Sequence, residues 1–271
     1  MNISFAERYG PWAIVTGASS GIGEQFATVL AERGLNVVIV ARRKDRLDRL
    51  AAELTARHGV QVQALELDLA AADFLQILLN ATADKDVGLV ISNAGFGLKG
   101  LHHLQEQGRL DSMLNVNVRA PTLIAQAFAP RLIERGKGGI LITGSVEGFL
   151  GFPWSAAYAA TKAFVHSLGE ALWAELKPHG VDVLVLAPSA TDTDAVSLQG
   201  FDASQMHNLM PPRQVAQMAL AHLKYGPTYV PGAMNRAMVR FLMLLPRRWA
   251  VTLAGKGTKA AMDKAENRKP F

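Results

Sequence analysis

Thr16-Gly17-Ala18-Ser19-Ser20-Gly21-Ile22-Gly23 follows a short apolar run at residues 13–16 and opens an amphipathic stretch at residues 24–33. A glycine-rich turn between a strand and a helix brings backbone N–H groups and the positive end of the helix dipole to a phosphate. Gly17 and Gly21 permit the tight turn, and Gly23 permits close packing of the helix on the strand. The stretch predicts a dinucleotide-binding loop that includes Ser19, Ser20 and Ile22; a tight turn with no ligand is the alternative.

Five more apolar, β-branched runs follow along the chain, at residues 36–41, 61–67, 87–92, 139–143 and 181–187. Helical patterns such as residues 45–58 and 164–177 separate them, as right-handed crossovers require. This order predicts an α/β fold, a doubly wound parallel sheet of the Rossmann type with helices on both faces. We expect one catalytic domain at residues 1–232, with a substrate lid at about 194–212, and a C-terminal helical extension with a basic tail at 233–271.

The composition excludes several classes of protein. The chain has 271 residues, 49% of them hydrophobic and 19% charged, and no cysteine, which excludes disulfide scaffolds, thiol nucleophiles and cysteine-based metal sites. Residues 236–271 hold nine Lys or Arg and two acidic residues, which gives this segment a charge of +7. Since the whole chain has a net charge of +5, residues 1–235 carry −2. The main body therefore gives no electrostatic reason to expect a nucleic-acid partner.

The start of the chain does not resemble a secretory signal, because Glu7 and Arg8 precede a glycine-rich segment. No apolar stretch reaches the roughly 18 residues that a membrane-spanning helix needs. We therefore expect a cytoplasmic protein.

Two arginines end the second predicted strand, in Ala41-Arg42-Arg43. An NAD enzyme places an acid near this point to bind the ribose hydroxyls, whereas guanidinium groups suit a 2′-phosphate. Arg42 and Arg43 therefore favour NADP(H) over NAD(H); a solvated start of a basic helix is the alternative. After the third strand, Asp68 and Leu69 are predicted to bind the adenine, unless Asp68 caps the next helix.

Tyr158 and Lys162 lie four residues apart in a run of good helix formers and share one helix face. Tyr-x-x-x-Lys by itself is common and usually structural. Ser145 closes the fifth predicted strand, and Asn117 lies within a long helical pattern. The four residues together predict a catalytic group.

With Asn93-Ala94-Gly95 after the fourth strand, residues 10–190 resemble the short-chain dehydrogenase/reductase family, in its single-domain branch. The resemblance implies hydride transfer between a nicotinamide and a carbonyl or alcohol carbon, with Tyr158 as the proton donor or acceptor. It implies that Lys162 stabilises the phenolate and reaches the ribose, that Ser145 binds the substrate oxygen and that Asn117 holds a proton-relaying water. A phenol of pKa about 10 needs such a neighbouring cation to act near neutral pH.

The same resemblance implies further cofactor contacts. Asn93 fixes the central sheet, Gly95 leaves room for the ribose beside Ala94, and Pro188, Thr191 and Thr193 hold the nicotinamide carboxamide. Ser189 stands where the family commonly has glycine, which leaves the local backbone path open. The chemistry needs no metal ion, and the histidines show no metal-ligand spacing.

Other departures concern the substrate. Glu147, two residues after Ser145, stands where a small residue is common; we interpret it as a solvated loop acid, with selection of a polar or cationic group as the alternative. Apolar residues on the predicted active-site loops indicate an apolar pocket, unless half of them are core residues: Phe96, Phe149, Leu150, Phe152, Trp154, Phe201, Met206 and Met210. His207 in the lid is a weak substrate candidate.

Met238, Phe241, Leu242 and Leu245 recur at helical spacing beyond residue 230, and Pro246 starts a second helix. This extension packs on the substrate face or a second subunit in one interpretation. In the other, its Arg, Lys and Trp residues contact a membrane surface.

We expect an NADP(H)-dependent oxidoreductase acting on a carbonyl or secondary alcohol of a fairly apolar substrate: a 3-oxoacyl derivative, a bulky ketone or a steroid-like alcohol. The resemblance also implies a homo-oligomer, a dimer or tetramer. The alternatives are a membrane-surface reductase of long-chain lipid carbonyls and an NADP(H)-binding redox sensor without turnover. The intact set of Asn117, Ser145, Tyr158 and Lys162 argues against a sensor.

Overall fold

A seven-stranded, fully parallel sheet forms the centre of the computed structural model, which describes residues 3–193 and 209–266. The strand order is β3-β2-β1-β4-β5-β6-β7. The strands are β1 (Trp12–Thr16), β2 (Asn36–Ala41), β3 (Val62–Glu66), β4 (Val87–Ser92), β5 (Gly138–Thr143), β6 (Val181–Leu186) and β7 (Thr228–Tyr229). The predicted doubly wound parallel fold is confirmed.

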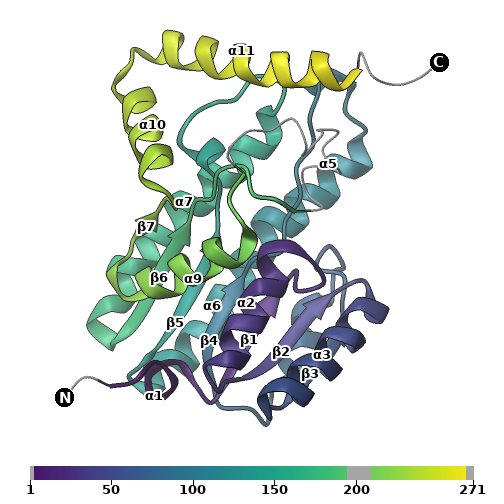
Figure 1. Cartoon of the computed structure of the whole chain (residues 1–271), viewed down its shortest axis with the longest axis vertical. Helices are drawn as coiled ribbons and strands as arrows, with labels where there is room; N and C mark the ends of the chain where they lie inside the picture. The colour runs from purple at the N-terminus through teal and green to yellow at the C-terminus, as the bar shows by residue number, and fades with distance from the viewer. Residues whose placement is uncertain (1–2, 194–208, 267–271) are drawn as a thin grey trace.

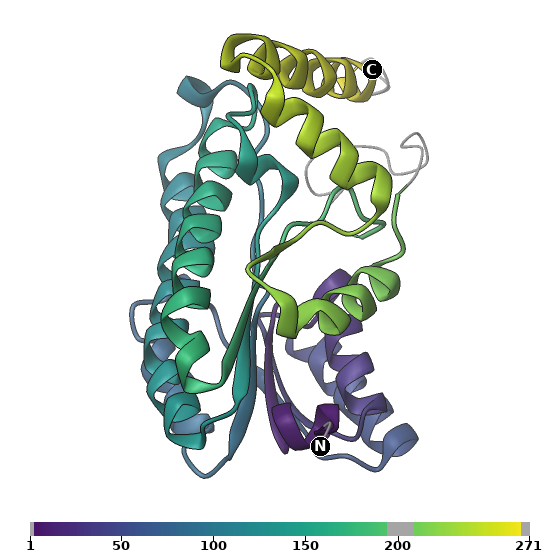
Figure 2. The same ribbon diagram turned by 90° about the vertical axis from the view of Figure 1, so that its left-hand side faces the viewer.

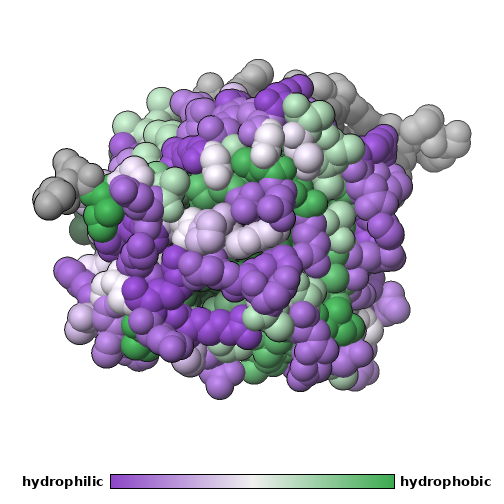
Figure 3. All heavy atoms as spheres, turned by 90° about the horizontal axis from the view of Figure 1, so that it is seen from below, coloured by the Kyte–Doolittle hydropathy of each residue, from purple (hydrophilic) through white to green (hydrophobic). Residues whose placement is uncertain are grey.

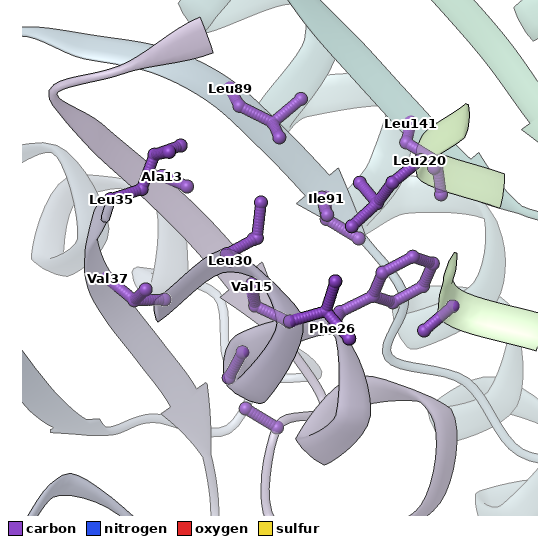
Figure 4. Close-up of a cluster of buried hydrophobic side chains, with 14 of the residues drawn as sticks. Ala13, Val15, Phe26, Leu30, Leu35, Val37, Leu89, Ile91, Leu141 and Leu220 are labelled. Carbon is purple, nitrogen blue, oxygen red and sulfur yellow. The ribbon is translucent and has the colours of Figure 1, made fainter. Parts of the chain in front are cut away.

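Helices cover both faces of the sheet (Figures 1 and 2). One face carries α2 (Gly21–Glu32), α3 (Lys44–His58) and α9 (Pro212–His222); the other carries α4 (Phe74–Ala81), α6 (Ala120–Arg135) and α7 (Ala156–Leu176). Each helix buries an apolar face, so both sides of every central strand are removed from water. Figure 4 shows Phe26 and Leu30 of α2 against Val15 and Ile91 of the sheet.

The strand order reverses at β1, which lies between β2 and β4. In open parallel sheets the crevice at such a point, beyond the carboxyl ends of the strands, is where ligands bind. The strands end on the side of the molecule that carries the last two helices, α10 (Ala233–Leu244) and α11 (Arg247–Glu266) (Figure 1). The opposite end, seen in Figure 3, carries mainly hydrophilic residues with smaller hydrophobic areas between them.

The remaining elements are short and connect the layers. They are α1 (Phe5–Tyr9), α5 (Gln107–Leu114), the π turn η2 (Asn115–Arg119), and the 3₁₀ turns η1 (His102–Leu104), η3 (Val146–Phe149), η4 (Lys177–His179) and η6 (Leu223–Tyr225). In the described residues no helix is both long and apolar enough to cross a membrane.

The extension forms the two predicted helices, and α11 begins directly after Pro246. It packs on the segment between η3 and α7: a Cβ on Gly255 would lie 2.8 Å from Pro153 Cγ and 3.2 Å from the Trp154 ring. The Arg247 guanidinium also donates to the Phe149 carbonyl at 3.3 Å. The predicted lid, with Phe201, Met206 and His207, lies mostly outside the described residues.

Candidate active site

A cleft of about 580 Å³ opens at the carboxyl ends of the strands. Nearly all of the predicted cofactor and catalytic residues line it. They are Gly17, Ser19, Ser20, Gly21, Ile22, Arg42, Arg43, Asp68, Leu69, Asn93, Ala94, Gly95, Ser145, Tyr158, Lys162, Pro188, Thr191 and Thr193. Gly23 and Asn117 do not line the cleft; they lie behind it and shape its wall.

The glycine loop has the geometry of an anion cradle. Gly17 and Gly21 adopt φ angles of +69° and +60°, which side chains rarely tolerate, and α2 begins at Gly21. A Cβ on Gly21 would lie 2.9 Å from the Thr193 methyl group, so the segment after β6 closes over the helix N-terminus. A Cβ on Gly23 would collide with the Gly17 carbonyl, which explains why α2 approaches β1 so closely.

Arg43 belongs to the same cradle. Its Nη2 donates to the hydroxyls of Ser19 at 2.9 Å and Ser20 at 2.6 Å, and its Nε donates to Ser19 at 3.0 Å. Arg42 is exposed on the rim of the cleft. Both guanidinium groups therefore line the cleft near the end of β2. Because Arg43 donates hydrogen bonds to Ser19 and Ser20, Arg43 is not merely a solvated residue at the start of α3.

Asp68 does not cap a helix, because α4 begins only at Phe74, with Asp73 in the cap position. Its Oδ1 accepts from the Ala70 N–H at 2.9 Å and so caps a turn on the cleft rim. Leu69 is buried beneath that rim. The carboxylate and the leucine form one edge of the cleft, at the end of β3.

Asn93 ties three strands together at the floor of the cleft. Its Nδ2 donates to the Thr16 carbonyl at 3.1 Å, and its Oδ1 accepts from the Thr143 hydroxyl at 3.2 Å. The buried Thr16 hydroxyl in turn accepts from the N–H groups of Asn93 and Ala94, both at 3.0 Å. Thr16 belongs to the predicted glycine-rich stretch, whereas sequence reasoning assigned no role to Thr143, because a threonine at the end of a strand carries no recognisable spacing.

Asn117 sits in the π turn η2 between α5 and α6 and is buried. Its Oδ1 accepts from the Phe96 N–H at 3.1 Å, and its Nδ2 donates to the Phe96 carbonyl at 2.9 Å and to Thr161 at 3.1 Å. A Cβ on Gly95 would lie 3.1 Å from Asn117 Oδ1 and 3.2 Å from Lys162 Nζ. The Asn117 side chain therefore fixes the loop after β4 beside Lys162.

Ser145, Tyr158 and Lys162 meet at the inner end of the cleft. The Ser145 hydroxyl accepts from the Glu147 N–H at 3.2 Å and lowers the pKa of the Tyr158 phenol. Lys162 Nζ donates to the Thr143 carbonyl at 2.8 Å and lies 5.6 Å from the centroid of the Tyr158 ring. The first two turns of α7 thus present the phenol and the ammonium to Ser145, two residues beyond the end of β5.

Burial sets the protonation of this group. It raises the pKa of Tyr158 above its usual value of 10, the Glu147 carboxylate raises it further, and only the Ser145 hydrogen bond lowers it. Burial lowers the pKa of Lys162 to about 8, against the opposing effect of Glu147. The phenol is therefore neutral at pH 7, while the ammonium keeps most of its charge.

His166, one turn beyond Lys162 on α7, was missed at the sequence level. Its Nε2 accepts a 3.4 Å hydrogen bond from the Ser145 N–H, and its ring lies 4.6 Å from that of Phe149. Burial, with a smaller effect of Lys162, lowers the pKa of His166 to about 4. The imidazole is therefore neutral and supports the backbone of Ser145 from behind.

The interpretation of Glu147 as a solvated loop acid is wrong. Lys99 Nζ lies 2.6 Å from Glu147 Oε1 and 2.9 Å from Oε2, and the Ser155 hydroxyl donates to Oε2 at 2.5 Å. Lys99 also donates to Ser155 Oγ at 2.8 Å. The side chains of Lys99 and Glu147 are only 6% and 19% exposed, so this is a largely buried ion pair beside Tyr158.

The residues present fit a nicotinamide dinucleotide. The cradle at the start of α2 suits a pyrophosphate, the arginines suit the adenosine end, and Thr191 and Thr193 line the cleft on the segment that passes Gly21. In residues 3–193 and 209–266 no three His, Asp or Glu side chains gather as metal ligands. A bound dinucleotide would supply the redox chemistry at this site, with the chain supplying the proton.

The comparisons with known proteins agree with this geometry. The family model for short chain dehydrogenase matches residues 11–201. The chain is 30% identical over 255 residues to a 7beta-hydroxysteroid dehydrogenase from Clostridium sardiniense, covering 94% of this chain and 98% of that one. It is 32% identical over 183 residues to a human very-long-chain 3-oxoacyl-CoA reductase, covering 66% of this chain and 59% of that one.

Two solved structures bear on the cofactor. A short-chain dehydrogenase from Sphingobium yanoikuyae in complex with NADPH is 33% identical, has a TM-score of 0.78 and covers 88% of this chain and 96% of its own. A 3-ketoacyl-(acyl-carrier-protein) reductase from Brucella melitensis complexed with NADH is 30% identical and has a TM-score of 0.71; the match covers 84% of this chain and 98% of that one. From its family model, its relatives and its fold, the chain belongs to the short-chain dehydrogenase/reductase family.

Proposed function

We propose that this protein is an NADPH-dependent reductase of ketones, working reversibly on the matching secondary alcohols. The observation that carries the proposal is the meeting of Ser145, Tyr158 and Lys162 at one end of a cleft whose other end holds the glycine cradle and two arginines. Membership of the family supplies the reaction class, hydride transfer at a carbonyl or alcohol carbon.

The preference for NADPH rests on Arg42 and Arg43. Family members of this similarity bind NADPH or NADH, so membership alone does not choose between them. A guanidinium pair at the end of β2 suits a 2′-phosphate, and no acid stands there to bind the two ribose hydroxyls.

The chain's own residues handle the proton. The Ser145 hydroxyl donates to the substrate carbonyl oxygen and stabilises the charge that develops there. Because the pKa of Tyr158 is raised, its phenol is protonated at pH 7 and can deliver a proton to that oxygen. The cofactor, when bound, supplies the hydride from its nicotinamide ring. Lys162 stabilises the phenolate that is left, and Asn117 keeps the loop beside Lys162 in place.

The substrate end of the cleft favours a fairly apolar ketone. Phe96 and Val146 line it, and Phe149 and Leu150 pack behind it. A bulky ketone, a steroid ketone or a 3-oxoacyl derivative fits such a wall, and one relative is a steroid dehydrogenase.

We also propose that the enzyme works in the cytoplasm as a homo-oligomer. Four exposed apolar side chains form a ridge along one face of α10: Met234, Met238, Phe241 and Leu244. A second copy that covers this ridge removes it from water. The same ridge, flanked by Arg240 and Arg248, favours the second candidate, a reductase that reaches long-chain lipid carbonyls at a membrane surface.

The test follows NADPH oxidation at neutral pH with a bulky cyclic ketone, a steroid ketone, a 3-oxoacyl thioester and a long-chain aldehyde. Tyr158→Phe is the blank, and NADH is run beside NADPH. Turnover of at least one ketone that is lost in the variant supports the proposal. Tight NADPH binding without turnover of any carbonyl would overturn it in favour of a redox sensor.

A further inference from the structure

The ion pair of Glu147 with Lys99 faces the substrate end of the cleft. Glu147 lines the cleft together with Ser145 and Tyr158, and its backbone N–H donates to the Ser145 hydroxyl at 3.2 Å. Lys99 lies behind it, with Nζ 5.3 Å from the centroid of the Tyr158 ring. The Glu147 carboxylate, whose Oε1 lies 2.6 Å from Lys99 Nζ, is therefore on the same side of the cleft as the Tyr158 ring, where a substrate carbonyl must bind.

Packing alone does not explain this carboxylate. A buried ion pair is generally no more stable than an apolar pair of similar volume. The neighbouring wall residues, Phe96 and Val146, are apolar. An acid in such a wall that faces the reacting atoms therefore indicates a polar group on the ligand.

The hydrogen bonds show which partner can contact a substrate. Lys99 uses its three N–H donors on Glu147 Oε1, Glu147 Oε2 and Ser155 Oγ. Among the residues that the structure describes, Glu147 Oε2 accepts from both Lys99 and Ser155, whereas Oε1 accepts one bond, from Lys99. Since each carboxylate oxygen has two acceptor positions, Oε1 has room for one more donor. A substrate can therefore give a hydrogen bond here, to Glu147, and receives none from Lys99.

We propose that Glu147, held by Lys99 and Ser155, is a specificity-determining residue that accepts a hydrogen bond from a hydroxyl or N–H group next to the reacting carbonyl of the substrate. The inference rests on the proposed ketone reduction. It names the substrate class as neutral hydroxyketones or aminoketones with an otherwise apolar body. A carboxylate or phosphate at this position is rejected, because it would face the Glu147 charge with no cation free to bind it.

The test compares benzoin, as each enantiomer, with deoxybenzoin, the same bulky ketone without the hydroxyl. The measured quantity is the ratio of the two kcat/KM values in NADPH oxidation. We expect the better benzoin enantiomer to exceed deoxybenzoin by about tenfold to a hundredfold, as for other hydrogen bonds to a charged group. A ratio near one in the wild-type enzyme would overturn the inference.

Variants test whether the Glu147 carboxylate causes the difference in kcat/KM between benzoin and deoxybenzoin. Lys99→Met with Glu147→Leu removes both charges and the acceptor, so no lone buried charge is left, and should bring the ratio to about one. Lys99→Met with Glu147→Gln keeps a carbonyl acceptor and should give an intermediate ratio. As a matched control, Arg8→Met with Asp182→Leu removes another part-buried pair, at the other end of β6, and should keep the wild-type ratio.

The outcomes separate the two proposals. If neither ketone is reduced by the wild-type enzyme, nor any carbonyl of the panel above, the proposed function fails. If deoxybenzoin is reduced and the Leu double variant keeps the wild-type ratio, the inference about Glu147 alone fails. An equal loss on both ketones in both double variants, with the ratio unchanged, would show that the pair merely positions the loop.

Discussion

At the scale of single residues, burial rather than sequence spacing sets the chemistry of the site. Tyr158 and Lys162 are one helical turn apart, yet the pKa of each moves in the direction of its uncharged form because the protein removes water from both. A neutral phenol is the species that protonates a carbonyl. The resting site is therefore prepared for reduction at neutral pH.

The lowered pKa of Lys162, about 8, predicts a pH dependence. As pH rises through 8 the ammonium loses its proton, and with it the attraction for the developing phenolate. Between pH 8 and 10, kcat/KM for NADPH should fall about tenfold per pH unit. The Lys162→Arg variant should be less active than the wild type. Because its guanidinium stays charged, its kcat/KM for NADPH should not fall between pH 8 and 10. A flat wild-type profile up to pH 10 would contradict the account.

Arg42 and Arg43 should determine which dinucleotide binds. Replacing both with Gln should raise the Kd for NADPH by about tenfold to a hundredfold, because charge-assisted bonds to the 2′-phosphate are lost. The Kd for NADH should change little. Arg49→Gln, an exposed arginine further along α3, serves as the control. Equal weakening of both cofactors, measured by quenching of protein fluorescence, would show that the arginines only shape the loop.

His166 should make stability depend on pH. Its folded pKa of about 4 lies below the value of 6.5 expected in the unfolded chain, so the unfolded state binds more protons between these values. Stability therefore falls as pH drops below 6.5, by about 2 kcal/mol between pH 7 and pH 5. His166→Gln keeps an acceptor for the Ser145 N–H without titrating. Urea unfolding should show that the free energy of unfolding falls, from pH 7 to pH 5, by about 2 kcal/mol less in the variant than in the wild type. An equal fall in both proteins would contradict the lowered pKa of His166.

The sequence predicted the part of the site that is local in the chain. The glycine loop and the Tyr158–Lys162 pair are short patterns whose spacing fixes their geometry. The Lys99–Glu147 pair joins residues 48 apart, and the His166 contact with Ser145 joins residues 21 apart. The first contact requires the loops after β4 and β5 to lie side by side, and the second requires α7 to lie beside the loop after β5, so neither spacing by itself indicates a contact. An isolated acid in a loop is usually solvated, and for Glu147 the prediction made on that basis is wrong.

At the scale of elements, the contact of α2 with β1 positions the cradle. Gly23→Ala places a Cβ against the Gly17 carbonyl and 2.6 Å from Asn93 Nδ2, so α2 must shift. We expect a loss of about 1–3 kcal/mol in the free energy of unfolding and a Kd for NADPH at least about tenfold weaker. Gly257→Ala on α11, where a Cβ meets nothing within 4 Å, is the matched control. Unchanged NADPH binding in Gly23→Ala would show that the cradle tolerates movement of α2.

The six long strands were predicted to within one residue at each end, because buried parallel strands read as continuous apolar runs. The helix patterns gave α2 and α3 within a few residues, and the run of helix formers around Tyr158 and Lys162 together with the pattern at residues 164–177 covers α7 (Ala156–Leu176). The two residues of β7 carry no periodic signal, and η2 lies within a helical pattern that does not distinguish a π turn from an α-helix. The π turn depends on tertiary contacts of Asn117 with Phe96 and Thr161, which no local pattern records.

At the scale of the whole molecule, the ridge on α10 should hold copies of the chain together. Met234, Phe241 and Leu244 are 76%, 56% and 85% exposed in one copy. Met238→Glu with Phe241→Glu places charges on the ridge and should convert the oligomer to monomers in sedimentation velocity experiments. Thr252→Glu, on an exposed face of α11, is the control. A wild-type monomer that cosediments with anionic vesicles, and loses this in the double variant, would favour the membrane-surface reductase instead.

In the proposed reaction, a hydride passes in this cleft from NADPH to a ketone carbon while Tyr158 supplies the proton. The most direct measurement uses NADPH carrying deuterium on one or the other face of nicotinamide C4, with a bulky ketone, and mass spectrometry of the alcohol. We expect one of the two labelled cofactors to place a single deuterium on the carbinol carbon, and Tyr158→Phe to form almost no alcohol. Alcohol without deuterium from either cofactor, or undiminished product in the variant, would contradict the account.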